Sequence, residues 1–102
     1  MQRLFAKIRK RMNDMNETET TTETTYRVYL RWPGARVSDK TVTTSPVRAL
    51  AAFRKLLNMT ALRGEKVSAA LTMDGKQKYF HRFNAKPGSA DYIEPDADLT
   101  LP

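Results

Sequence analysis

The sequence YRVYLRW, residues 26–32, alternates apolar and basic side chains along its whole length. One face of an extended chain would carry Tyr26, Val28, Leu30 and Trp32, and the other Arg27, Tyr29 and Arg31. A period of two, with β-branched and aromatic residues, is typical of a strand that is buried on one side. The stretch therefore predicts a strand with an apolar inner face and a basic outer face that also holds a tyrosine.

The residues that follow predict a second strand joined to the first by a tight turn. The Pro-Gly pair at 33–34 suits the two central positions of a β-turn, with Pro first and Gly second. The second strand is expected over residues 37–44. Within it, Val42 is expected to face inward, between outward Thr41 and Thr43.

A capped helix is predicted next, ending near Asn58. Ser45 can cap the free N–H groups of a helix start, and Pro46 is tolerated at the first helical position. The apolar side chains of this segment recur at helical spacing and predict one buried face, made of Val47, Leu50, Phe53 and Leu57.

Residues 66–73 and 76–83 predict a hairpin around the pair Asp74-Gly75, for which two registers are open. A two-residue turn would place Leu71 on the same face as Lys78 and bury a charge. A three-residue loop over 73–75 avoids this and is the register we favour. It pairs Leu71 with Gln77, Ala69 with Tyr79, and Val67 with His81.

The order strand, strand, helix, strand, strand predicts an α+β fold for residues 26–85, taken as a single domain. The simplest architecture is a four-stranded antiparallel sheet with one helix packed on one face. In the favoured register, the other face carries Arg27, Tyr29, Arg31, Thr41, Thr43, Lys66, Ser68, Thr72, Lys76, Lys78, Phe80 and Arg82. The candidate binding residues are the basic and aromatic members of that set: Arg27, Tyr29, Arg31, Lys66, Lys76, Lys78, Phe80 and Arg82.

The flanking segments differ in composition from this domain. Residues 1–12 predict a short basic amphipathic helix, whose cations Lys7, Arg9, Lys10 and Arg11 form a secondary basic arm. This arm could contact nucleic acid, an anionic membrane surface or the exposed sheet of the protein itself. We rank a weakly ordered arm first, nucleic acid second and a membrane third. Residues 13–25 are expected to be a disordered Thr/Glu linker. Residues 86–102 are expected to be an acidic C-terminal tail that is mobile except where Tyr92 and Ile93, and further on Leu99 and Leu101, anchor it to the domain.

Charge and composition narrow the classes of function. The net charge of +7 is concentrated in residues 26–85, which hold twelve Lys/Arg and three Asp/Glu, and this favours a polyanion or an acidic protein face as partner. The absence of cysteine excludes disulfides, Cys-ligated metal and a thiol nucleophile. His81 is the only histidine, and we expect it to be a structural side chain. We therefore expect no enzyme, no cofactor, no metal and no membrane span.

Three interpretations remain open for the uncovered sheet face. Aromatic side chains that stack bases, among cations that contact phosphates, are typical of single-strand nucleic-acid binders, and each stacked base contributes about 1–3 kcal/mol. An ordinary solvated face is the alternative, because Lys, Arg and Thr are expected there. A protein interface, including a homodimer, is the third interpretation, since a core of this size is marginal alone.

The stretches YRVYLRWPG, VSDKTVTTSP and KYFHRFN, within residues 26–84, resemble small uncharacterised accessory proteins carried on bacterial mobile elements. That group includes anti-CRISPR-type inhibitors, which dock on a host complex. The resemblance implies a cytoplasmic bacterial protein and adds a second hypothesis, a protein-binding inhibitor or adaptor. It carries over no functional residues.

Overall fold

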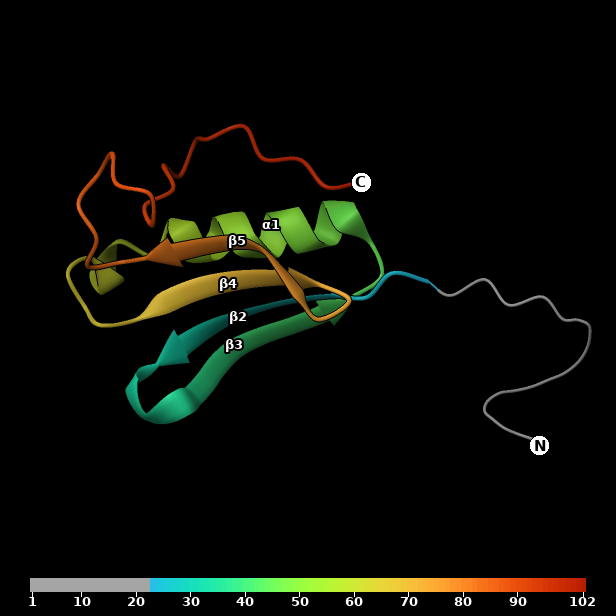
Figure 1. Cartoon of the computed structure of the whole chain (residues 1–102), viewed down its shortest axis with the longest axis horizontal. Coiled ribbons are helices and arrows are strands. Elements are labelled where there is room, and N and C mark those ends of the chain that lie inside the picture. Colours follow the sequence, from blue (N-terminus) through green and yellow to red (C-terminus); the bar gives the residue numbers. More distant parts are fainter. Residues whose placement is uncertain (1–22) are drawn as a thin grey trace, which may run out of the picture.

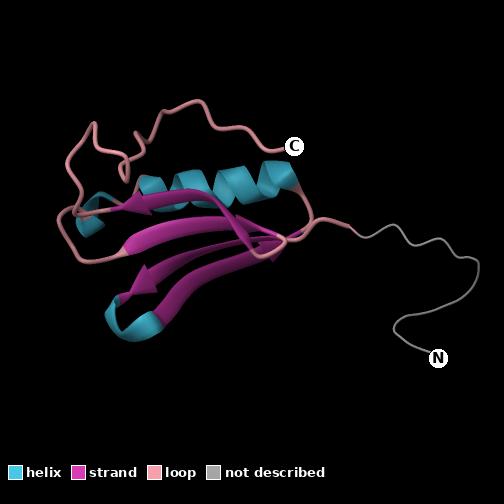
Figure 2. Ribbon diagram, viewed as in Figure 1, coloured by secondary structure: helices cyan, strands magenta, loops and turns pink. Residues whose placement is uncertain are grey.

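In a computed structural model that describes residues 23–102, one helix packs across one face of a four-stranded antiparallel sheet (Figures 1 and 2). The sheet order is β3-β2-β4-β5, and the elements are β2 Tyr26–Trp32, β3 Arg36–Thr43, α1 Pro46–Leu57, β4 Ser68–Met73 and β5 Lys76–Arg82. Short 3₁₀ turns occupy Pro33–Ala35 and Thr60–Leu62. The predicted α+β sheet with one helix is confirmed. The predicted N-terminal helix lies outside the described residues, as does most of the predicted linker.

The core lies between α1 and the inner face of the sheet. Val28 and Leu30 of β2, Leu71 of β4 and Phe53 of α1 are fully buried. The Phe53 ring also stacks near Tyr79 of β5, with 6.0 Å between ring centroids. Burying an apolar side chain of this size contributes about 1.5–3 kcal/mol, so these four side chains are a main source of stability.

The helix begins as the sequence predicts, but its buried face is rotated. The Ser45 side chain accepts a hydrogen bond from the Arg48 N–H at 3.2 Å, and Pro46 follows at the first position. Ala49 is fully buried, whereas Val47 is 76% exposed, so the predicted place of Val47 in the core is wrong. The reason is geometric: two residues correspond to about 200° around a helix, which points Val47 away from Ala49.

Strand β3 also differs from expectation, because it contains a bulge. Val42 pairs with Arg27 on the side away from the helix and is 53% exposed, so its predicted inward position is wrong. Thr41 and Thr43 pair instead with Val28 and Tyr26, two buried residues of the inner face.

The bulge explains why both valines of β3 lie on the outer side. The register shifts between Val28 and Leu30, opposite Asp39, whose φ of 53° is left-handed. The extra residue brings Val37 and Val42 to the same face although they are five positions apart. On the inner side, the Oγ of Ser38 accepts a hydrogen bond from the Trp32 indole N–H at 2.7 Å.

The β4–β5 hairpin turns on two residues, so the favoured three-residue loop is wrong. Met73 pairs with Lys76 across Asp74 and Gly75, whose φ values of 50° and 83° fit a type I′ turn. The register then shifts by one residue at Lys78. The observed pairs beyond the shift are Leu71 with Tyr79, Ala69 with His81, Ala70 with Phe80, and Ser68 with Arg82. Because the bulge restores the alternation, Tyr79 and His81 still face inward, and Phe80 and Arg82 outward.

Residues 86–102 pack against this same core and run beside α1 (Figure 1). Leu99 is buried, and Ile93, Ala97 and Leu101 pack around it. The Tyr79 hydroxyl both donates to the Thr100 carbonyl at 2.8 Å and accepts from the Thr100 N–H at 3.0 Å. The C-terminal segment therefore covers the part of the inner face near β5 that the helix leaves open.

Truncation of Phe53 tests the position of the core. Phe53→Ala should lower the free energy of unfolding by about 3–5 kcal/mol, because the cavity is fully enclosed. Val47→Ala on the same helix should change it by less than about 0.5 kcal/mol. Urea unfolding followed by circular dichroism measures both, and equal losses would contradict the helix orientation described above.

Candidate functional site

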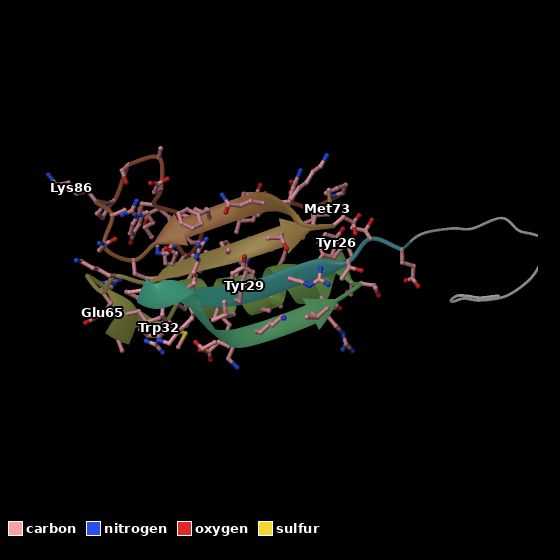
Figure 3. The ribbon with its side chains drawn as sticks, turned by 60° about the horizontal axis from the view of Figure 1, so that its bottom comes forward. Tyr26, Tyr29, Trp32, Glu65, Met73 and Lys86 are labelled. Carbon is pink, nitrogen blue, oxygen red and sulfur yellow. The ribbon has the colours of Figure 1, made fainter. Side chains whose placement is uncertain are left out.

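The sheet face opposite α1 brings together most of the predicted site residues. Figure 3 shows this open face, with Tyr29 near its centre and the helix behind the sheet. Cross-strand pairing arranges the residues of β2, β4 and β5 in three rows: Tyr29–Ala70–Phe80, Arg31–Ser68–Arg82 and Arg27–Thr72–Gln77. Every charged side chain in these rows is an arginine.

The central row forms a small apolar patch. Ala70 is only 2% exposed, although it lies on the face that the helix does not cover. Its neighbours Tyr29 and Phe80 are half-buried. Side chains at directly opposed positions have Cβ atoms about 4.5–5.5 Å apart, so the two rings can cover the small alanine between them. The patch offers two aromatic side chains within one row.

The three arginines of the open face remain available to a ligand. Arg27, Arg31 and Arg82 are all exposed. Arg82 makes an ion pair with Asp91 at 3.8 Å, but both side chains are about half exposed, at 50% and 52%. Exposed pairs of this kind contribute about 0–1 kcal/mol, so a phosphate or a carboxylate of a partner can displace Asp91.

Not all predicted cations join this face. Lys76 lies in the same cross-strand row as Met73 and the buried Tyr26, which is a row of the inner face. The expected place of Lys76 on the open face is therefore wrong. Lys66 is exposed but precedes β4 at the end of the sheet. Lys78 is the exposed extra residue of the β5 bulge, two positions before Phe80. The predicted basic arm of residues 7–11 lies outside the described residues.

Sequence reasoning missed two residues of the open face. Val37 and Val42 of β3 pair with Arg31 and Arg27 and are 50% and 53% exposed. They add an apolar margin beside the arginines. Only the bulge at Asp39 places both of them there, and a bulge leaves no simple signal in a sequence.

His81 has the surroundings of a structural side chain. It is 3% exposed, and the rings of Phe83 and Tyr92 meet it edge-on, with centroids at 4.6 and 4.9 Å. Its Nδ1 accepts a hydrogen bond from the Ile93 N–H at 3.0 Å, which ties the C-terminal segment to β5. Burial lowers the pKa of His81 below 6.5, because it disfavours the charged imidazolium.

Two hollows, the possible metal ligands and the helices complete the description of residues 23–102. A hollow of about 380 Å³ lies at one end of the sheet, beside Arg63 and Tyr92. A second, of about 260 Å³, lies between α1 and β3, beside Lys40 and Lys55. Within the described chain, no group of three His, Asp or Glu side chains could hold a metal. None of its helices is long and apolar enough to cross a membrane.

No family model, curated protein or solved structure matches this chain. The open face is therefore interpreted from its own chemistry. It combines two half-buried rings, Tyr29 and Phe80, with three exposed arginines, and none of its paired positions on β2, β4 and β5 carries an acidic side chain. This arrangement can stack flat groups and contact anions at the same time.

The buried His81 makes stability depend on pH. Because its folded-state pKa lies below the unfolded value of 6.5, the unfolded chain binds the proton more readily. The free energy of unfolding should have its full value above pH 6.5 and decrease as the pH falls toward the lower folded-state pKa. Urea unfolding at about pH 7.5 and about pH 5.5 compares the free energy of unfolding above and below the unfolded-state pKa, and the lower pH should give the smaller value.

His81→Gln is the matched control, because its amide oxygen can still accept from the Ile93 N–H but does not titrate. The variant should lose most of the difference between the two pH values. An undiminished difference in His81→Gln would assign the pH dependence to other groups.

Proposed function

We propose that this protein is a small non-enzymatic module that binds nucleic acid through the open face of its sheet. The observation that carries the proposal is the row Tyr29–Ala70–Phe80 lying beside the row Arg31–Ser68–Arg82. Arginines contact phosphates and hold the ligand in place, while aromatic side chains stack on the bases. A ligand that presents both groups repeatedly is a nucleic acid.

The distribution of charge supports this proposal over an ordinary solvated face. A solvated face usually mixes both signs. Of the acids of the C-terminal segment, which are Asp91, Glu94, Asp96 and Asp98, the last three belong to the part of the chain that packs beside α1. Only Asp91 among them makes an ion pair with an arginine of the open face. The paired positions of β2, β4 and β5 on the open face carry arginines and no acid, so the field of this face attracts a polyanion.

Reversal of charge on β2 tests the proposal. The double variant Arg27→Glu, Arg31→Glu should weaken binding at least about tenfold and reduce the dependence on salt, because each lost phosphate contact lowers the slope by about one. Fluorescence anisotropy with labelled single- and double-stranded DNA and RNA, at about 50 and about 200 mM salt, measures both quantities.

The control changes the net charge equally on the other side of the molecule. Arg48 and Lys55 are exposed residues of α1, and the double variant Arg48→Glu, Lys55→Glu should bind much as the wild type does. If both double variants lose affinity equally, nucleic acid binds through the overall positive charge of the protein and not through the open face. If neither does, the open face does not bind nucleic acid.

The exposed Val37 and Val42 favour a second candidate function, a protein-binding inhibitor or adaptor that docks on a host complex. Apolar side chains beside exposed arginines are common where protein surfaces meet, because arginine and apolar groups are both used in interface cores. Phosphate contacts and base stacking would leave these valines unused.

Substitution of the two valines separates the candidates. The double variant Val37→Ser, Val42→Ser should leave the affinity for nucleic acid unchanged. If the protein-binding function is correct, the same variant should no longer recover the protein partner in a pull-down from nuclease-treated bacterial lysate. Arg48→Glu, Lys55→Glu serves again as the control that retains the partner. A partner held equally by the valine variant would contradict docking on this face, and sedimentation velocity of the purified chain shows whether the partner is a second copy.

A further inference from the structure

The open face carries the same side-chain pattern on two of its strands. Strand β2 contains RVYLR, residues 27–31, and β5 contains KYFHR, residues 78–82. In each, a basic residue, an aromatic residue and an arginine occupy every second position. We call these sets ring-and-cation units: the first is Arg27, Tyr29 and Arg31, and the second is Lys78, Phe80 and Arg82.

The topology sets the two units in the same direction. Strand β4 is antiparallel to both β2 and β5, so β2 and β5 run parallel to each other. Tyr29 and Phe80 both pair with Ala70, and Arg31 and Arg82 both pair with Ser68. The units are therefore related by a simple translation across β4, with ring beside ring and arginine beside arginine. Two strand spacings make that translation about 10 Å.

The side chains of β4 between the two units are small, so they do not project above the rings on either side. The residues of β4 on this face are Ser68, Ala70 and Thr72. The bulge limits the match at one end, because Gln77 pairs with Thr72 while Lys78 is the extra residue beside it. Ring and arginine are thus matched in both units, and the first cation is displaced.

We infer that the open face binds one unpaired strand of nucleic acid, with one base on Tyr29 and a second base of the same strand on Phe80. A single strand repeats a planar base and a phosphate in one direction, which is the symmetry of the two units. A duplex presents two backbones of opposite direction and keeps the faces of its bases stacked inside, so it can use the arginines but not the rings. This inference rests on the proposed nucleic-acid function and specifies its ligand.

The inference is tested with two oligonucleotides of equal length, an oligothymidylate and its abasic counterpart, which has the same phosphates and no bases. The full chain should bind the oligothymidylate more tightly than the abasic strand, and more tightly than a duplex of the same length. Tyr29→Leu and Phe80→Leu keep an apolar cover over Ala70 but remove the ring. Each should weaken oligothymidylate binding about 5- to 150-fold and leave abasic binding unchanged.

Tyr29→Phe is the matched control, because it keeps the ring and should retain affinity within about twofold. Unfolding curves verify that the leucine variants are folded, and the wild-type comparison of thymidylate with abasic strand tests the inference without any variant. If the wild type binds duplex or abasic strand as tightly as oligothymidylate, the inference is wrong. If reversal of Arg27 and Arg31 still abolishes that binding, the proposed function survives. If no nucleic acid binds in any form, both are wrong.

Discussion

The alternation along β2 is the constraint on which the rest of the structure depends. This strand pairs with β3 on one side and β4 on the other, so its alternation sets which face of the central strands the helix covers. Val28 and Leu30 are fully buried, while Arg27 and Arg31 are exposed on the opposite face. A slip by one residue would bury two unpaired arginines and expose the apolar side chains, which no local rearrangement could offset.

Within residues 23–102, every segment that covers the sheet lies on its inner side. Helix α1 has twelve residues and contacts β2, β3 and β4, and the C-terminal segment continues the layer beside β5 through Leu99 and the hydrogen bond from Ile93 to His81. Two consequences follow for the open face. The described residues leave it uncovered, and most of the acids of the C-terminal segment lie away from its arginines, so among these residues its positive charge is only partly offset, by Asp91.

Two bulges decide which side chains the open face presents. In β3, the bulge at Asp39 brings Val37 and Val42 to this face together. In β5, the bulge at Lys78 shifts the register by one residue, so that Phe80 and Arg82 face outward although the turn has only two residues. Without it, the tight turn would have sent Tyr79 outward and left Phe80 facing the core. The parallel ring-and-cation units therefore depend on an irregularity of the ladder as much as on the alternation of the sequence.

The sequence by itself determined the features that depend on neighbours in the chain: the alternating strand at 26–32, the cap at Ser45, the place of the hairpin around Asp74 and Gly75 though not the length of its turn, and a core built on Val28, Leu30, Phe53 and Leu71. It also indicated Arg27, Tyr29, Arg31, Phe80 and Arg82 as neighbours on one face. The tertiary structure alone decided the rotation of α1 that exposes Val47, the two bulges, the length of the β4–β5 turn and the row in which the exposed Lys76 lies. These features depend on contacts between segments that are distant in the sequence, and the local periodicity of the sequence does not specify those contacts.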